Sequence, residues 1–589
     1  MISRGQILRI GLIGLILALV LVLVGCEFAT KPPSTEVPPT AFVDPVSVDF
    51  VPLPPVPGLQ DRVITIRPGE AIVDNELVFS GQGSEIDAVI ATANNERPEL
   101  ALEVVASLSF EYIDEIIAAG RLKQELVDPR FVASADAGGM FRIDLYRYAG
   151  DAVPLDEALT VLARIASDLE TKVVVDPNYV MGFNPDLSAN PWGLEGSPWG
   201  LEGSPWGLEG SGSGGPAAAS DYFWSQWAFG KQFGISLSDG PGVADLTNRT
   251  VDGTGRGVQV VVFDTSPFPA PGGYSFLGWG PPPELMVGYS APVSLPNSAG
   301  ATTDISDHGL FVAGLVYAVA PASNIHLIKV LNDQGQGDLF GFIAAVNVFV
   351  QSAVQGGGAL EPTVVNLSLG AQAPTDAELP AAGQAAIQQM VTNAGINPLS
   401  PSLLPIVALE APIRILRALG AVIVAASGND SAVPPDFVAP ANVPAGYPPV
   451  IAVGASNQAR GLSCFSNAAS LAAPGGEGFD LSGSPATCSP HFNSCIGSNP
   501  DCEYGVISYV YRVRKGYAFW AGSSFSTPMV SGLAALLLEA GVADDAAGPA
   551  LACGITGRLQ ALPDPAPAAT PLGLGVIRVP ETLQAPCVP

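Results

Sequence analysis

Four residues in the C-terminal part of the chain are of the types that carry out nucleophilic catalysis on acyl groups. Asp264 ends the apolar run VQVVVFD, His308 opens HGLFVAG, Asn429 closes VIVAASGN, and Ser524 lies in GSSFSTPMVSG. A serine hydroxyl needs a neighbouring base such as histidine to become nucleophilic. A carboxylate can orient that histidine, and an amide can donate a hydrogen bond to the oxyanion of the intermediate. The four residue types therefore indicate acyl transfer through a serine.

The elements expected around these residues place them at one edge of a sheet. Short β-branched runs predict strands at 258–264, 325–331, 363–369, 421–427 and 450–456, and longer apolar stretches predict helices at 339–353 and 411–420. This alternation predicts an α/β fold, a parallel sheet with helices on both faces. Asp264 and Asn429 follow strand ends, while His308 and Ser524 open further predicted helices. Sites of parallel sheets gather beyond the carboxyl ends of strands, so we expect these positions to converge.

Histidine is scarce enough to identify the candidate base. The chain has three histidines, of which His326 lies in a predicted strand and His491 in a cysteine-rich stretch. His308 is therefore the candidate base.

The context of two other motifs excludes two other kinds of site. The GTGRG of residues 253–257 precedes a strand, whereas a dinucleotide loop follows one. No G-x-S-x-G elbow of an α/β-hydrolase surrounds a suitable serine.

The surrounding motifs resemble those of the subtilisin-like serine protease (subtilase) family over most of residues 221–545. VVFDTS is similar to the family's Asp motif, DHGLFVAG to HGTHVAG, and GSSFSTPMVSG to GTSMASPHVAG. VAPASNIHLIKVL, VVNLSLG and YPPVIAVGASN match flanking family segments in the right order. The resemblance implies a serine endopeptidase with catalytic Asp264, His308 and Ser524, and with Asn429 in the oxyanion hole. It also implies that Ser368, Leu369 and Gly370 bind the substrate as an added strand.

The chain departs from the family pattern beside several of these residues. Leu310 and Phe311 replace Thr and His, Ser266 replaces a Gly, and Ser523 replaces a Thr. The calcium-binding loop that usually follows the His motif is absent, so we expect no cofactor and carry over no calcium site, although a calcium requirement stays possible. An insertion at 475–519 carries three cysteines. The alternative function is a catalytically silent pseudoprotease acting as a cell-surface binding scaffold; a decayed enzyme would be expected to lose one of the four residues.

The N-terminus predicts export. Residues 10–24 form an unbroken apolar run, shorter than the roughly 20 residues of a membrane span and typical of a signal peptide. The run ends in Leu-Val-Gly-Cys26, which resembles the lipobox of bacterial lipoproteins. Residues 1–25 are therefore interpreted as a lipoprotein signal peptide, with a lipid on Cys26 that anchors the exported protein to the outer side of the cell membrane. A plain signal peptide or an uncleaved anchor is the alternative.

Three further segments precede the predicted catalytic domain at 221–589. Residues 26–61 are a Pro-rich tether. The pattern of residues 62–184 predicts a small α+β domain, with strands at 62–68, 141–148 and 171–180 and a helix at 154–167. This segment resembles the propeptide, or inhibitor, domain of subtilases. The alternative is an unrelated adhesion or sorting domain. Residues 185–220 hold three PWGLEGS repeats, either a cleavage zone or a plain spacer. Cutting there would leave the propeptide on the membrane and free the protease.

Composition limits the partners. The chain has 589 residues and a net charge of −30, which argues against nucleic acid or anionic membrane as an electrostatic partner. The expected partners are protein or peptide substrates, the chain's own propeptide domain, and the membrane through the lipid on Cys26.

Six other cysteines allow 15 pairings as disulfides, which persist outside the cytoplasm. A zinc site at Cys488, Cys495, Cys502 and His491 is the alternative, but the spacing does not fit.

Overall fold

The computed structural model divides the chain into two compact units, residues 1–47 and 48–589, and every residue described below belongs to the second unit. The described residues are 53–59, 62, 71–118, 128, 130–131, 140–150, 152–182, 226–229, 233, 253–268, 272–275, 286–291, 305–357, 360, 362–371, 374–399, 406–431, 438–477, 505–511, 516–542 and 576–577. The predicted signal peptide, the Cys26 predicted to carry a lipid, most of the tether and the repeat linker lie outside these residues.

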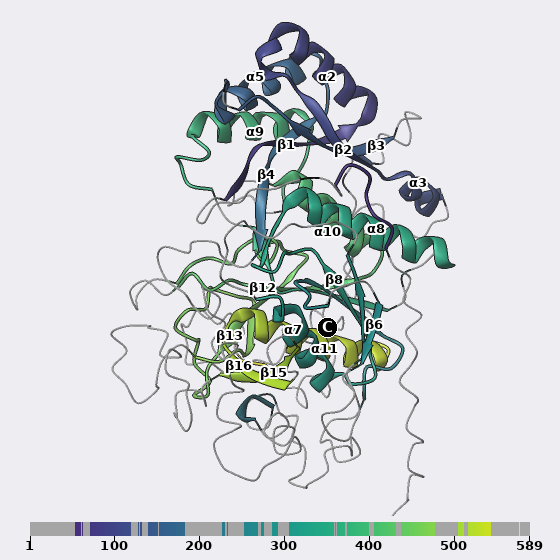
Figure 1. The fold of residues 1–589 in the computed structure, drawn as a ribbon, viewed down its shortest axis with the longest axis vertical. Coiled ribbons are helices and arrows are strands. Elements are labelled where there is room, and N and C mark those ends of the chain that lie inside the picture. Colours follow the sequence, from purple (N-terminus) through teal and green to yellow (C-terminus); the bar gives the residue numbers. More distant parts are fainter. Residues whose placement is uncertain are drawn as a thin grey trace, which may run out of the picture. The chain divides into compact units, whose positions relative to one another are not determined.

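Among the described residues, the C-terminal part contains one sheet of eight strands in the order β14-β13-β12-β10-β5-β8-β7-β6 (Figure 1). The strands are β5 (Gln259–Asp264), β6 (Gly272–Ser275), β7 (Met286–Ser290), β8 (Asn324–Lys329), β10 (Thr363–Leu367), β12 (Val422–Ala426), β13 (Ile451–Ser456) and β14 (Leu471–Pro474). Pairing is parallel from β14 to β7, but β6 pairs antiparallel with β7. The expected α/β fold is thus observed, with one antiparallel edge strand that the sequence reading missed.

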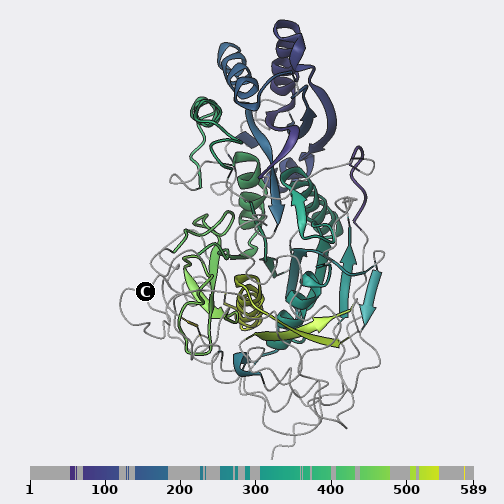
Figure 2. The same cartoon turned by 60° about the vertical axis from the view of Figure 1, so that its left-hand side comes forward.

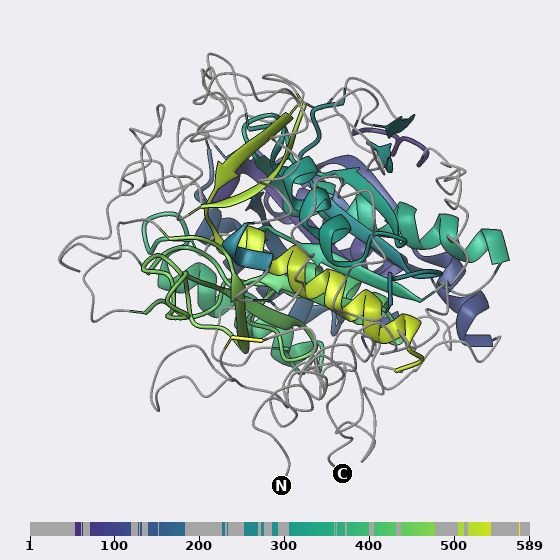
Figure 3. The same ribbon diagram turned by 90° about the horizontal axis from the view of Figure 1, so that it is seen from below.

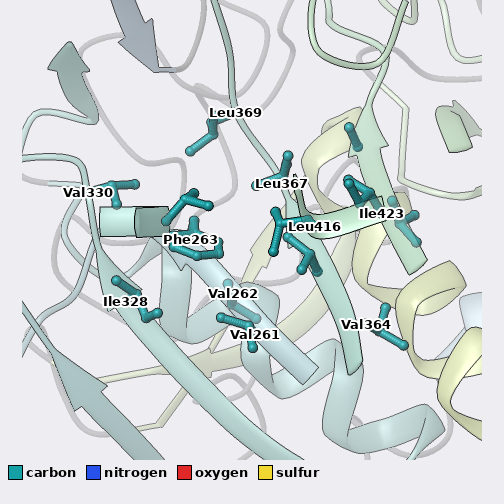
Figure 4. Packing of buried hydrophobic residues seen from close by; sticks show 14 of the residues in the cluster. Val261, Val262, Phe263, Ile328, Val330, Val364, Leu367, Leu369, Leu416 and Ile423 are labelled. Carbon is teal, nitrogen blue, oxygen red and sulfur yellow. The ribbon is translucent and has the colours of Figure 1, made fainter. Parts of the chain in front are cut away.

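Helices cover both faces of this sheet. Helices α7 (His308–Val319) and α11 (Ser523–Glu539) pack together on one face, and Figure 3 shows α11 as the yellow helix crossing it. Helices α8 (Leu339–Gly357) and α10 (Val407–Ala418) pack together on the other (Figure 2). The strands between them are buried on both sides, as the successive side chains of Val261, Val262 and Phe263 show, because they alternate between the two faces (Figure 4). Burying such a side chain contributes about 1.5–3 kcal/mol, which explains the unbroken apolar runs.

Residues 71–182 form a second, antiparallel sheet, which we call the N-terminal module. Its strands pair in the order β4-β1-β3-β2. They are β1 (Ile72–Gln82), β2 (Glu103–Ser109), β3 (Phe141–Arg147) and β4 (Val174–Gly182), and the helices are α2 (Gly83–Glu96), α3 (Glu111–Ala118) and α5 (Leu155–Asp168), with a 3-10 turn at Pro98–Leu100. The predicted helix 154–167 and the strands at 141–148 and 171–180 are present. Of the predicted strand at 62–68, only Arg62 is described.

Five further elements of the C-terminal part complete the fold. The end of β4 pairs with both β9 (Gln336–Asp338) and β11 (Gly370–Ala371). Helix α9 (Ala381–Asn393) lies beside α5 and was not predicted (Figure 1). Strands β15 (Val506–Val510) and β16 (Gly516–Trp520) form an antiparallel hairpin just before α11, within the stretch predicted to be an insertion.

Candidate active site

The end of β5 meets the start of α7 through a buried pair. Asp264, the last residue of β5, accepts a hydrogen bond at Oδ1 from Nδ1 of His308, the first residue of α7, at 2.8 Å. Both side chains are fully buried. The same oxygen accepts the backbone N–H of Thr265 at 2.7 Å. With Nδ1 held by a carboxylate, the other ring nitrogen, Nε2, is the one that can accept a proton.

Close packing around this pair requires a glycine at position 309. Thr265 Oγ1 donates to the carbonyl of Ser306 at 2.9 Å and accepts the N–H of Gly309 at 3.0 Å. A Cβ on Gly309 would lie only 2.2 Å from the carbonyl oxygen of Thr265. The glycine after His308 therefore lets α7 approach β5 closely enough for the hydrogen bond between His308 and Asp264.

Ser524 lies at the start of α11, only 4% exposed. Its hydroxyl donates to the carbonyl oxygen of Ser368 at 3.3 Å, and Ser368 Oγ donates back to the carbonyl oxygen of Ser524 at 2.8 Å. Asn366 Nδ2 donates to Ser368 Oγ at 3.0 Å. Because a helix begins with unpaired N–H groups and the positive end of its dipole, negative charge that develops near Ser524 is stabilised there.

Asn429 follows β12 and is held in one orientation. Its Oδ1 accepts the backbone N–H of Ser523 at 2.9 Å, so its Nδ2 donor is directed away from that contact. Gly428, with φ of +111°, makes the turn that carries Asn429, and its own N–H is donated to Ser523 Oγ at 3.2 Å. The Ser that replaces the family's Thr at 523 thus links the loop of Asn429 to the start of α11. An amide donor next to a serine at a helix start can stabilise an oxyanion.

The three residues expected to bind substrate lie beside the gap between β9 and β11, which a strand of the N-terminal module fills and which we call the groove. Ser368 is fully buried and contacts Ser524 as described, and Leu369 is also buried. Gly370 pairs through its backbone with Gly182, at the end of β4, which pairs on its other side with Gln336 of β9. The strand that lies in this groove therefore comes from the N-terminal module. Sequence reasoning found one wall of the groove and missed β9, whose short QGD stretch carries no apolar pattern.

An aromatic box, which we define as Phe311, Trp520 and Phe525, surrounds the imidazole of His308. The ring centroid of His308 lies 5.4 Å from that of Trp520, edge-on, and 5.2 Å from that of Phe525. Phe311 lies 4.6 Å from Phe525 and 5.5 Å from Trp520. All three side chains are buried. The Phe that replaces the family's His at 311 is therefore part of an apolar wall, and its aromatic partners were the signal the sequence reading missed.

The remaining sequence candidates find structural roles or lie outside the described residues. Burial lowers the pKa of His326 to about 4, so this histidine is neutral at pH 7 and structural. The GTGRG loop donates the N–H groups of Thr254 and Gly255 to Glu539 at 2.6 Å each. Cys464 is disulfide-bonded, while the other six cysteines, Cys26 included, and His491 lie outside the described residues.

The described residues contain neither a metal-binding cluster nor a membrane-crossing helix. Among them, no group of three or more His, Cys, Asp or Glu side chains is placed to hold a metal ion. In the same part of the chain, no helix combines the length and the hydrophobicity of a membrane crossing.

Comparison with known proteins identifies the C-terminal part. The sequence model of the subtilase family matches residues 287–545, which include His308, Asn429 and Ser524, whereas Asp264 lies upstream of the match. Subtilisin from Bacillus pumilus is 26% identical over 255 residues, 42% of this chain and 68% of the relative. Subtilisin E from Bacillus subtilis (strain 168) is 25% identical over 255 residues, 42% of this chain and 49% of the relative.

A third relative, the extracellular serine proteinase of Thermus sp. (strain Rt41A), is 28% identical over 297 residues, 49% of this chain and 52% of the relative. The chain thus spans about half to two thirds of the length of these relatives. The matched part of the chain, residues 287–545, is a domain of the subtilase family, the family of subtilisin-like serine endopeptidases.

Proposed function

We propose that this protein hydrolyses peptide bonds of protein substrates by acyl transfer through Ser524. The observation that carries the proposal is the buried hydrogen bond of 2.8 Å between His308 Nδ1 and Asp264 Oδ1, with the His308 ring 5.2 Å from that of Phe525, the residue after Ser524. His308 Nε2 takes the proton of Ser524 Oγ as that oxygen bonds to the substrate carbonyl carbon. Asn429 Nδ2 and the N–H of Ser524 donate hydrogen bonds to the oxyanion.

The second half of the reaction uses the same groups. As the intermediate collapses, the bond to the amine breaks and His308 donates its proton to the leaving nitrogen. A water molecule then gives a proton to His308 and attacks the acyl carbon. The bond from that carbon to Ser524 Oγ breaks, His308 returns the proton to Oγ, and the carboxylic acid product leaves. An extended substrate would bind between β9 and β11 through backbone hydrogen bonds, as β4 does in the structure.

We also propose that the protein is made as a zymogen, with the N-terminal module as its inhibitor. The support is that β4 fills the groove beside Ser368, whose carbonyl contacts Ser524. Antiparallel strands keep register, so the residues that follow Gly182 are the ones that would approach Ser524. We therefore expect self-cleavage C-terminal to Gly182 and no later than residue 220.

The proposed location is outside the cytoplasm. One relative in the comparison is named a minor extracellular protease, and the apolar run at 10–24 is typical of a signal peptide. We propose that a lipid on Cys26 holds the precursor on the outer side of the membrane and that cleavage frees the protease. Finding the mature catalytic domain still joined to an acylated Cys26 would contradict this release.

The experiment compares the expressed wild-type chain with Ser524→Ala by intact-mass spectrometry, and both with a Ser526→Ala control. Ser526 is a buried serine of the same helix, and its Oγ has no hydrogen-bond partner within the described residues. We expect wild type and the control to be cut after Gly182 and to hydrolyse a denatured protein, and Ser524→Ala to do neither. If wild type stays whole and hydrolyses nothing, the pseudoprotease scaffold replaces the enzyme.

A further inference from the structure

Helix α9 is encoded in the C-terminal part of the chain but packs in the apolar core of the N-terminal module. It follows β11 in sequence and lies beside α5 in space (Figure 1). One core cluster joins Leu77, Phe79 and Leu162 of the N-terminal module to side chains that follow β11. These side chains are Leu379, Ala386, Ile387, Met390, Val391, Ala394, Ile396 and Val407. The buried positions of α9 recur every three to four residues, so one face of the helix is committed to this contact.

Two closer contacts fix this arrangement. A Cβ on Gly383 of α9 would lie 3.3 Å from the backbone Cα of Asp156 of α5, so the two helices touch nearly backbone to backbone at this point. Just before α9, Glu378 Oε1 accepts the N–H of Ala71, at the start of β1, at 2.6 Å. The segment 374–399 is therefore attached to both a helix and a strand end of the N-terminal module.

The opposite face of the N-terminal sheet has its own contacts with the C-terminal part. Side chains alternate along β1, so Leu77 and Phe79 belong to the cluster with α9, whereas Val78 belongs to a cluster that includes Phe340 of α8. On this side Tyr112 Oη also donates to Asn347 Oδ1 of α8 at 2.7 Å. The module thus contacts α8 and α10 with one face and α9 with its helical face, in addition to the strand in the groove.

We propose that segment 374–399 is a retention surface that keeps the N-terminal module, residues 71–182, bound after the chain is cut between the two parts. The proposal rests on the proposed function, in which this module inhibits the active site. Because contacts on three sides must break together, cleavage and release become separate steps, and the cut module stays as an inhibitor until it dissociates. The face of α9 sets how long that takes.

The test uses the full chain with Ser524→Ala and a recognition sequence for an added sequence-specific protease placed within residues 191–211. After cutting, the C-terminal fragment is captured on a surface and the loss of the N-terminal fragment is followed over time. Ile387→Ala with Met390→Ala removes two buried side chains of α9. Gln388→Ala with Gln389→Ala, two exposed positions of the same helix, is the matched control. We expect the first pair to speed dissociation by about a hundredfold or more, since truncating each well-buried contact weakens binding by about tenfold or more.

A third variant tests whether faster dissociation could result from a misfolded C-terminal fragment. Gly383→Leu removes no apolar side chain and adds a good helix former, but the side chain has no room against α5. It should also speed dissociation, while the melting temperature of the freed C-terminal fragment stays at or above that of the parent. Equal dissociation rates for parent, control and both α9 variants would overturn the proposal, as would immediate dissociation of the parent.

The outcome of this test does not depend on whether the proposed function is right. The fragments are made by an added protease in a Ser524→Ala background, so retention is measured whether or not the protein is an enzyme. Failure of the proposed function appears elsewhere, as a wild-type chain that neither cuts itself nor hydrolyses protein. If the protein is active, the Ile387→Ala/Met390→Ala variant should also show a shorter lag between self-cleavage and hydrolysis.

Discussion

Gly182, the last residue of β4, pairs antiparallel with Gly370 of β11, two residues after the carbonyl that accepts the hydroxyl of Ser524. Gly182 also pairs with Gln336 of β9, so the end of the N-terminal module is the middle strand of three. This close pairing requires glycine at 182, because a Cβ there would lie 2.3 Å from the carbonyl oxygen of Gly335. Since β4 occupies the position proposed for the substrate, activity must be measured after the N-terminal module has been removed.

Asp264→Asn should lower kcat by about 10⁴ at neutral pH, because an amide favours the wrong tautomer of His308; this magnitude is borrowed from another serine protease. The hydrogen bond to Nδ1 would be kept in length but reversed in direction. Steady-state kinetics on a peptide substrate checks this, with thermal unfolding to show that the fold is retained. A loss of less than tenfold would contradict the role assigned to Asp264.

Asn429→Asp should lower kcat by at least 10²–10³ with little change in KM, because the oxyanion loses a donor and gains a negative neighbour; the size comes from subtilisin itself. The variant keeps the Oδ1 acceptor for the N–H of Ser523, so the turn should be preserved. Ser523→Ala is the control, since it removes a side-chain contact to Gly428 but no oxyanion donor. Comparable losses of kcat in both variants would assign the effect to the turn and contradict the donor role.

The attachment of the N-terminal module should depend on pH through Asp176. This carboxyl of β4 is fully buried, and its Oδ2 accepts the N–H of Ala408 at the start of α10 at 2.9 Å. Burial raises its pKa from 3.8 to about 7, with a smaller raising effect from Glu410 and a lowering one from Arg130. The attached state therefore binds a proton that the separated, solvated carboxyl does not hold. Attachment is strongest below about pH 4, weakens as pH rises to about 7, and is constant above that.

Measured on fragments cut in the Ser524→Ala background, the dissociation constant should rise about 10- to 100-fold from pH 5 to pH 7. Asp176→Asn should flatten this dependence, because the amide does not titrate. Asp168→Asn, an exposed aspartate of α5, is the control and should leave the slope unchanged. A slope that survives in Asp176→Asn would assign the pH dependence to another group.

Phe311→His, which restores the family's usual residue, should lower the free energy of unfolding by about 1–3 kcal/mol, because the imidazole would be buried among Trp520 and Phe525 without a hydrogen-bond partner. Denaturant unfolding in the Ser524→Ala background measures it. Phe311→Leu separates the loss of packing from the burial of a polar group. A histidine variant at least as stable as the leucine variant would show that the box tolerates polarity.

What the sequence predicts well here is local. The apolar run before Asp264 and the glycine–serine start before the apolar helix of Ser524 each lie within a few residues of the group they position. The strands at 421–427 and 450–456 are fixed in the same way, by β-branched side chains buried on both faces. The contact between His308 and Asp264, 44 residues apart, follows only once the sheet order is known.

What the sequence predicts poorly depends on partners far along the chain. Helix α9 has a readable pattern in Ile387, Met390 and Val391, but its partner α5 lies more than 200 residues earlier, and no local signal joins them. The positions of the antiparallel edge strand β6 and the short strand β9 depend on backbone pairing. The periodicity of side chains along the sequence carries no information about that pairing. The pairing of Gly182 with Gly370 is marked only by a glycine on each strand, and a glycine does not reveal which backbone comes close to it.

The contact of Glu539 with the amides of Thr254 and Gly255 links two elements of the active site at the ends that lie away from it. Glu539 is the last residue of α11, and Thr254 lies just before β5, so the contact joins the far ends of the two elements that carry Ser524 and Asp264. With 17 residues, α11 spans about 25 Å. Helix α11 and strand β5 are thus linked at one end by Glu539, while their other ends carry Ser524 and Asp264. A change at this far corner would shift nucleophile and carboxylate relative to each other, which makes it a place to adjust catalytic geometry without touching any group that meets substrate.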